Sequence, residues 1–463
     1  MTFANSSFRQ TCYLIHFPLS QGGIMKKKLQ EYALTVSCML LLPALAFAEP
    51  AATAPAKIDT GDTAFLLISA ALVMLMTPGL ALFYGGMVRG KNILSTLMQS
   101  FVAIALISVQ WILLGYSLVF GPDIGGIIGS LDWAFLRGVG VEPNTDYAAT
   151  VPHLAFMIYQ AMFAVITPAL ISGAVAERMK FSSFLVFTLA WSTIVYDPLA
   201  HWVWGNGGWL RTMGVLDFAG GIVVHISSGI SALAAAMVLG KRNGYLREAI
   251  YPHNLPMTVL GAGLLWFGWF GFNAGSALSS GALAATAFVT THTSAVTATL
   301  AWVLIEWIHR GKPTMFGAAT GAIAGLATVT PAAGFVSPMS AMLIGLLAGG
   351  ICYCALMVKG KLGYDDSLDA FGVHGVGGIL GTLALGLLAQ KAVNDAGANG
   401  LFFGDFRFFA TQLLAVGVST LYSFGVTIGL LKLIDLTMGL RVEEEDEVVG
   451  LDISQHGEKG YQL

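Results

Sequence analysis

Two histidines in apolar stretches of the chain each follow an aspartate by eight residues. Asp217 precedes His225 in DFAGGIVVH, and Asp366 precedes His374 in DSLDAFGVH. Ionisable side chains are rare and costly inside membrane segments, so this repeated pair is a hypothesis for a functional site. Neutral imidazole both donates and accepts hydrogen bonds, which suits the passage of a small polar solute or a proton relay. The aspartates have a second interpretation of equal weight, as helix caps.

The composition assigns the chain to the integral membrane proteins. It is 56% hydrophobic and only 11% charged, with a mean hydropathy of +0.74. A soluble domain carries about 25% charged residues. The formal net charge of -3 gives no reason to expect nucleic acid as a partner. The sequence lacks a nucleotide-binding P-loop and any metal-ligand spacing around either histidine, so we expect neither an enzyme nor a cofactor or metal.

The hydropathy pattern predicts an all-α fold with eleven transmembrane helices. Spans 1 to 5 and spans 6 to 10 form two blocks of five. Because five is odd, the second block enters the membrane from the side opposite to the first. This arrangement is typical of two inverted five-helix repeats, here followed by one extra helix. Eight residues of helix rise about 12 Å, so both histidines are predicted near the middle of a roughly 30 Å core. The predicted spans are 62–86, 93–120, 152–175, 181–200, 218–239, 255–274, 282–308, 315–331, 337–358, 370–390 and 408–438.

The amino-terminal segment is typical of a targeting sequence. Residues 25–48 have a basic start, an apolar run and a small-residue cleavage site, which predicts a signal peptide cut after Ala48. Residues 1–24 are interpreted as an over-extended start. Lysine and arginine are concentrated in alternate connections, which predicts a mature amino terminus outside and a cytoplasmic tail over residues 441–463.

Several blocks of sequence resemble the ammonium transporter and Rhesus family, and in particular its bacterial Amt branch. The blocks are DFAGGIVVHISSGISAL, PHNLPM, GWFGFNAGSA, GAIAGLATVTPAAG, FGVHGVGG and GLRVEEEDEVVGLDISQHGEKGY, in this order. The resemblance implies a transport domain over residues 58–440 in the bacterial inner membrane. It also implies a homotrimer with one pore in each subunit, ammonium as substrate and methylammonium as its analogue.

The resemblance also implies roles for individual residues. Ammonium would be recruited at an aromatic outer vestibule, deprotonated, and passed through an apolar pore lined by the two histidines. Asp197 belongs to none of the motifs and is interpreted as a solvated loop carboxylate. The implied set is Phe163, Trp204 and Ser276 for substrate binding, Phe163 and Phe272 as the gate, His225 and His374 in the pore, Asp217 as the vestibule acid, and Trp269 and Thr330 as further lining.

Two further functions stay open beside transport. One is an ammonium sensor that signals through its tail, which the shortness of the tail disfavours, and the other is a Rhesus-type channel for ammonia or carbon dioxide. The tail itself has two interpretations. Its acidic composition favours disorder, whereas the resemblance implies a segment that packs on the inner faces of the trimer, beside the docking place of a cytoplasmic PII signal protein. The predicted contact rim for that protein is Lys241, Arg242, Arg310, Lys312, Lys359 and Lys361.

Overall fold

The computed structural model describes residues 57–461. The predicted over-extended start and the signal peptide, residues 1–24 and 25–48, lie outside the described residues. Within residues 57–461 nearly all regular structure is helical, and a two-residue hairpin of β1 (Asp123–Ile124) and β2 (Ile128–Gly129) is the exception.

Ten helices of the described region are long and apolar enough to cross a membrane. Six of these spans are single, uninterrupted helices: α2 (Thr60–Met87), α5 (His153–Val175), α10 (Leu255–Gly275), α11 (Ala282–Arg310), α13 (Pro338–Leu362) and α15 (Phe406–Met438). The other spans combine shorter pieces. The second consists of η1 (Gly90–Asn92), α3 (Ile93–Gln110), η2 (Trp111–Gly115) and α4 (Tyr116–Phe120), and the fourth of α6 (Phe181–Trp191), η4 (Ser192–Tyr196), α7 (Asp197–Trp204) and α8 (Trp209–Thr212). The fifth consists of η5 (Gly221–Ile226) and α9 (Ser227–Leu239), and the last but one of η6 (Phe371–Gly375) and α14 (Val376–Leu388).

The predicted span 315–331 forms a helix that is shorter than the ten spanning helices. It forms α12 (Met315–Val329), only 15 residues long. At 1.5 Å per residue this helix covers about 22 Å, less than a bilayer core. Nearly all of α12 is buried between neighbouring helices, so it needs no long lipid-facing surface. The prediction of an all-helical membrane protein is confirmed, as ten spanning helices and one shorter apolar helix.

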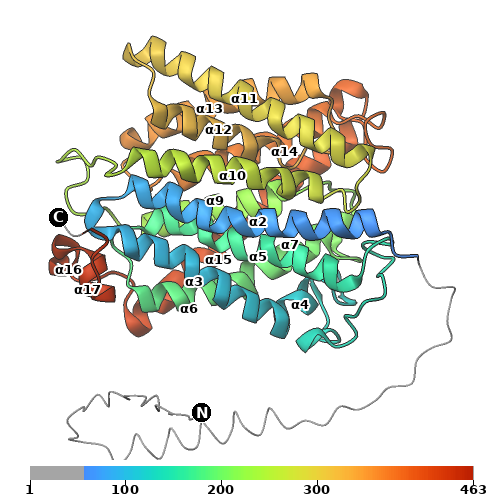
Figure 1. Cartoon of the computed structure of the whole chain (residues 1–463), viewed down its shortest axis with the longest axis horizontal. Helices are drawn as coiled ribbons and strands as arrows, with labels where there is room; N and C mark the ends of the chain where they lie inside the picture. Colours follow the sequence, from blue (N-terminus) through green and yellow to red (C-terminus); the bar gives the residue numbers. More distant parts are fainter. Residues whose placement is uncertain (1–56, 462–463) are drawn as a thin grey trace, which may run out of the picture. The chain divides into compact units, whose positions relative to one another are not determined.

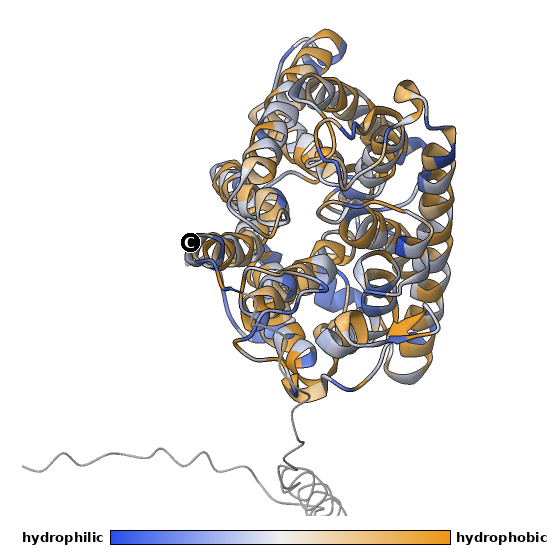
Figure 2. Ribbon diagram, turned by 90° about the vertical axis from the view of Figure 1, so that its right-hand side faces the viewer, coloured by the Kyte–Doolittle hydropathy of each residue, from blue (hydrophilic) through white to orange (hydrophobic). Residues whose placement is uncertain are grey.

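The spanning helices run side by side, and α2 lies along α10 near the middle of the bundle (Figure 1). Hydrophobic residues dominate the ribbons when the bundle is viewed from its end (Figure 2). Many large apolar side chains on the outer faces of α11, α13 and α15 are exposed, including Leu300, Leu346 and Leu421. Such faces suit contact with lipid or with another subunit rather than with water.

The segment after α15 is folded against one end of the bundle. It forms α16 (Glu444–Val449) and α17 (Leu451–His456), next to the start of α3. The Nζ atom of Lys91 donates to the carbonyl oxygens of Glu447 and Val448, each at 2.7 Å. The amide of Ser95 donates to Oδ1 of Asp452 at 2.9 Å. The interpretation of this tail as disordered is therefore wrong.

Candidate functional site

The two histidines meet inside the bundle. His225 lies on η5 and His374 on η6, both buried, and their Nδ1 atoms are 3.2 Å apart. Their rings are close to parallel, with centroids 5.2 Å apart and an interplanar angle of 17°. Both sit in π-helical turns, which are uncommon and often mark functional sites. The sequence spacing predicted this convergence, although it gave no sign of the π-helical turns.

Asp217 caps the turn that carries His225. Its Oδ1 accepts hydrogen bonds from the amides of Gly220 and Gly221 at 2.9 and 2.6 Å, and its Oδ2 accepts those of Ile222 and Val223 at 2.7 and 3.1 Å. Amides in the first turn of a helix have no partner within the helix, so one carboxylate satisfies four of them. The ionised carboxylate is the form that accepts at both oxygens.

Asp366 has a similar role on the other side. Its two carboxylate oxygens accept the amides of Ala370 and Phe371, at 3.2 and 2.8 Å, just where η6 begins. Each histidine therefore follows a carboxylate-capped helix start. The interpretation of both aspartates as caps fits the structure, and an additional electrostatic role of Asp217 stays a prediction.

A narrow apolar cavity adjoins the histidine pair. It measures about 10 Å³, and side chains such as Ile166, Leu170, Leu265 and Ile323 line it beside both imidazoles. A water molecule needs roughly 10–15 Å³ on this scale, so the passage admits about one small molecule at a time. The Nε2 atom of His225 is buried and has no hydrogen-bond partner among the described residues.

Two phenylalanine rings separate this cavity from a wider one. The centroids of Phe163 and Phe272 are 4.4 Å apart. Phe272 also lies over His225, with centroids 6.0 Å apart and an interplanar angle of 23°. Both rings are almost fully buried. The residues predicted as the gate thus form a closed apolar contact between the two cavities.

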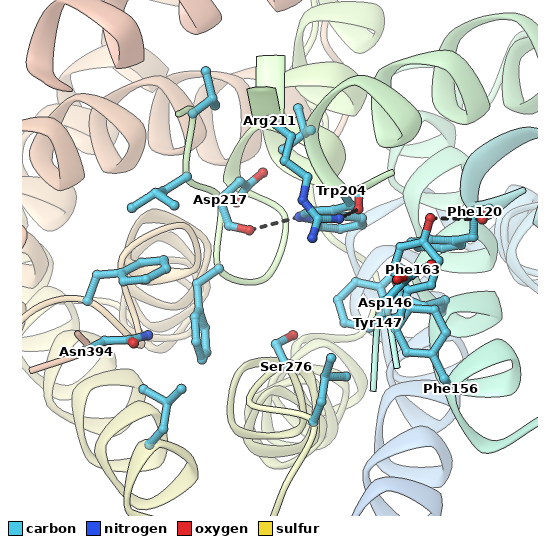
Figure 3. Close-up of a pocket in the computed structure, with 18 residues that line it drawn as sticks. Phe120, Asp146, Tyr147, Phe156, Phe163, Trp204, Arg211, Asp217, Ser276 and Asn394 are labelled. Carbon is cyan, nitrogen blue, oxygen red and sulfur yellow. Dashed lines mark hydrogen bonds between the residues drawn. The ribbon is translucent and has the colours of Figure 1, made fainter. Parts of the chain in front are cut away.

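The wider cavity, here called the vestibule, has a volume of about 320 Å³ and is lined by Phe163, Trp204, Ser276 and Asp217 among others (Figure 3). Trp204 contacts Phe163 edge to face at 5.9 Å, and its Nε1 donates to the carbonyl of Asp217 at 2.9 Å. The three residues predicted for substrate binding therefore share one chamber with the predicted vestibule acid.

Ser276 is held in place by a residue that the sequence motifs did not indicate. The hydroxyl of Tyr159 lies 3.1 Å from Oγ of Ser276 and donates to the carbonyl of Phe272 at 2.8 Å. Its ring also packs against Phe163 at 5.0 Å. Tyr159 is fully buried within an apolar helix, so its sequence context looks like that of an ordinary core tyrosine.

The two further lining residues form a pair beside the histidines. Nε1 of Trp269 donates to Oγ1 of Thr330 at 2.9 Å. The ring of Trp269 stacks over His225 with centroids 5.6 Å apart. Trp269 lines the narrow cavity directly, whereas Thr330 contributes by fixing the indole.

This bundle, with two buried histidines behind an aromatic gate, defines a multi-pass membrane transporter for a small solute. Residues 64–461 match the family model described as the Ammonium Transporter Family. The chain is 54% identical over 403 residues to an ammonium transporter of Bacillus subtilis, covering 87% of this chain and 98% of that one. It is 51% identical to ammonium transporter Amt1 of Archaeoglobus fulgidus, covering 87% and 99%. Among solved structures it is similar to Candida albicans Mep2, with a TM-score of 0.81, 36% identity and coverage of 88% and 91%.

The chain belongs to the ammonium transporter family, and its function is ammonium transport across a membrane. The resemblance found in the sequence motifs is confirmed, as is the expectation of a transporter rather than an enzyme.

Proposed function

We propose that ammonium is collected in the vestibule, loses a proton there, and crosses the narrow cavity as ammonia. One observation carries this proposal, an unbroken series of contacts from the vestibule to the histidines. Trp204 contacts Phe163, Phe163 contacts Phe272, and Phe272 covers His225, whose Nδ1 lies 3.2 Å from that of His374. Each step joins residues that the motifs singled out.

The physics of the two cavities assigns different forms of the solute to each. In the vestibule, the faces of Trp204 and Phe163 attract a cation by about 0.5–2 kcal/mol, and Oγ of Ser276 accepts a hydrogen bond from it. In the narrow cavity, a charge would be costly because the walls are apolar, by at least about 2.5–3.5 kcal/mol on insertion scales. Ammonia needs only hydrogen-bond partners there. The proton is therefore removed on the vestibule side of Phe272.

The histidine pair gives ammonia those partners. When both rings are neutral, one Nδ1 donates to the other across the 3.2 Å contact, so the two rings differ in tautomer. His225 lines the cavity, and its Nε2, which has no partner among the described residues, is then available to hydrogen-bond the solute. The same chain of imidazoles offers a route for a proton.

The proposed orientation places the vestibule outside the cell and the tail in the cytoplasm of a bacterium, with the protein in the inner membrane. The excess of lysine and arginine in the connections at the tail end supports this. The fold is proposed to consist of two inverted five-helix halves and one extra helix. The parallel roles of Asp217 with His225 and Asp366 with His374 support that relation.

We further propose a homotrimer whose tail end docks a cytoplasmic PII signal protein. The exposed apolar faces of the spanning helices are compatible with subunit contacts. Two members of the predicted basic rim are less available than the sequence suggested. Arg242 is buried in an ion pair with Asp365, and Lys359 pairs with Asp369. The rim is therefore proposed to consist of Lys241, Arg310, Lys312 and Lys361.

The test is flux into liposomes that contain the purified full-length protein, with ammonium, methylammonium and potassium as solutes. The wild-type protein should conduct the first two and exclude potassium. Replacing both His225 and His374 with alanine should abolish ammonium flux or turn it into an unselective cation leak. Phe272→Ala, which opens the aromatic contact but keeps the histidines, serves as the comparison variant. Unchanged flux and selectivity in the double-histidine variant would contradict the proposed path.

A further inference from the structure

Arg211 places a positive charge at the mouth of a transporter for a cation. It lies on α8 and lines the vestibule, next to Trp204 and Asp217 in Figure 3. Its Nη1 donates to the carbonyl oxygen of Trp204 at 2.6 Å, and the side chain is exposed. None of the sequence motifs includes this residue.

The charge of Arg211 is not neutralised by a neighbour. It forms no ion pair within 4.0 Å among residues 57–461. Asp217 lines the same chamber, but its two oxygens are engaged by four backbone amides. Asp146 is the other acidic residue of the lining, and it also has no ion-pair partner in the described part of the chain. Burial raises the pKa of Tyr147 to about 12, so this neighbour is neutral.

An ammonium ion between Trp204 and Ser276 therefore meets the unpaired positive charge of Arg211 and the unpaired negative charge of Asp146. Asp217 adds a second negative charge, which its four amide donors stabilise but do not cancel, and this charge is the same in all Arg211 and Asp146 variants. At separations of roughly 6–10 Å in a wet cavity, each unit charge changes the occupancy of a monovalent cation by about two- to tenfold. The effect falls with ionic strength because the Debye length is only about 10 Å at 0.1 M salt. Arg211 opposes capture of the ion, and Asp146 favours it.

We propose that Arg211 is an affinity-setting residue that weakens ammonium capture at the vestibule by charge repulsion, against the attraction of Asp146. This proposal rests on the proposed role of the vestibule in collecting ammonium. Because repulsion acts on charge alone, it shifts the KM for ammonium and for methylammonium by the same factor. It leaves kcat nearly unchanged, since the ion has lost its charge before it passes Phe272.

A structural role for Arg211 makes different predictions. Trp204 ends α7, and a donor at its carbonyl caps a helix terminus. If capping were the whole role, loss of the donor would disturb Trp204 and lower both kcat and affinity. Three substitutions separate the two roles. Arg211→Lys keeps the charge, Arg211→Gln removes the charge but keeps a donor, and Arg211→Met removes both.

The experiment measures saturable flux in liposomes, with the full-length protein and its Arg211 and Asp146→Asn variants, at ionic strengths of about 0.02 M and about 0.5 M. At low salt, Arg211→Gln and Arg211→Met should lower KM two- to tenfold, Arg211→Lys should match the wild type, and Asp146→Asn should raise KM. At high salt the differences should shrink to less than about twofold.

An unchanged KM in Arg211→Gln at low salt would overturn the proposal, as would an equal shift in Arg211→Lys. Calorimetric titration of the solubilised variants with ammonium gives the same comparison without flux. The variant Trp204→Leu distinguishes failure of the proposed function from failure of the inference about Arg211. If this variant binds and transports ammonium like the wild type, the vestibule is not the capture site and the proposed function fails. If it loses affinity while Arg211→Gln does not gain any, only the present inference fails.

Discussion

Gly229 on α9 and Gly375 at the end of η6 bring the two histidine-bearing segments into backbone contact. A Cβ atom added to Gly229 would lie 2.0 Å from the amide nitrogen of Gly375 and 2.8 Å from the carbonyl carbon of His374. No side chain is accommodated at that distance. The close approach of His225 and His374 therefore depends on a residue without a side chain one turn further along the helix.

We predict that Gly229→Ala separates the two histidines and lowers ammonium flux at least tenfold. The added methyl group meets the backbone of His374 and Gly375, so the two segments must move apart by more than a side-chain adjustment. Overpacking of this kind costs about 1–3 kcal/mol, and the thermal midpoint should fall accordingly. The measurements are liposome flux and thermal unfolding of the solubilised protein.

The matched control for this substitution is Gly263→Ala. Gly263 also lies in a spanning helix, α10, but a Cβ atom there meets nothing within 4 Å. This variant should retain wild-type flux and equal or slightly higher stability, because alanine favours a helix over glycine by about 1 kcal/mol. Equal losses in both variants would show that the Gly229–Gly375 contact has no special importance.

Asp217→Asn tests whether the vestibule acid acts only as a cap. The carboxylate accepts four amide hydrogens, whereas an asparagine side chain offers one acceptor oxygen and one donor group. About two buried amides lose their partner, at about 1–3 kcal/mol each. We expect reduced thermal stability and lost transport together.

The comparison for Asp217→Asn is Asp366→Asn, which caps the other histidine turn but lies outside the vestibule lining. Asp366 accepts two amides and Asp217 four, so a purely structural role predicts a smaller loss of stability in Asp366→Asn and a loss of flux that follows stability in both variants. A flux loss in Asp217→Asn that clearly exceeds the loss in Asp366→Asn, at matched stability, would assign Asp217 an additional effect on the ion. Wild-type transport by Asp217→Asn would show that transport does not need the charge of Asp217.

The sequence was sufficient for most of the fold and for the centre of the site. Apolar runs marked the helices because each must face lipid or other helices, and paired ionisable residues stood out against that background. The length of α12 was not foreseen, since a helix buried on all sides has the same composition as one that spans the bilayer.

Residues whose roles depend on long-range neighbours were missed. Asp197 was interpreted as a solvated loop carboxylate, but it is fully buried at the start of α7, and its Oδ2 accepts a hydrogen bond from Gln110 at 2.7 Å. The partner is 87 residues away, on another span. Tyr159 and Arg211 were missed for the same reason, because only the folded chain places them beside Ser276 and Trp204.

We predict that the stability of the protein depends on pH through Glu177, which lies at the end of the bundle where the tail is folded. Burial favours the neutral form, but the ion pairs with Arg242 and Arg89 outweigh it and hold the pKa of Glu177 below its ordinary value. A lowered pKa in the folded state stabilises the protein at pH above the unfolded-state value of about 4.3. This contribution is lost as the pH falls through the folded-state value.

The measurement is the thermal midpoint of the solubilised protein between about pH 7 and pH 3.5. It should fall steeply in the wild type below about pH 4.3. Glu177→Gln should be less stable at neutral pH, because removing one partner of a buried ion pair costs about 3–5 kcal/mol, and its midpoint should change less with acid. Glu248→Gln, at an exposed position, is the control and should follow the wild type. If the thermal midpoint of Glu177→Gln fell with acid as much as that of the wild type, Glu177 would not be the source of the pH dependence.

The last prediction concerns the ordered tail. Glu447 is buried, binds Nε of Arg441 at 2.6 Å, and accepts the amide of Asn243 at 3.1 Å. Its carbonyl also accepts from Lys91. The residue thus ties the tail to the connections after α2 and α9, at the end of the bundle opposite the vestibule.

We expect Glu447→Gln, and deletion from Glu443 onward, to release the tail and to lower flux while the spanning helices stay folded. Liposome flux and limited proteolysis of the tail measure the two effects, and Glu445→Gln, at an exposed position of the same helix, should leave both unchanged. Wild-type flux in the deleted protein would show that the docked tail does not influence transport.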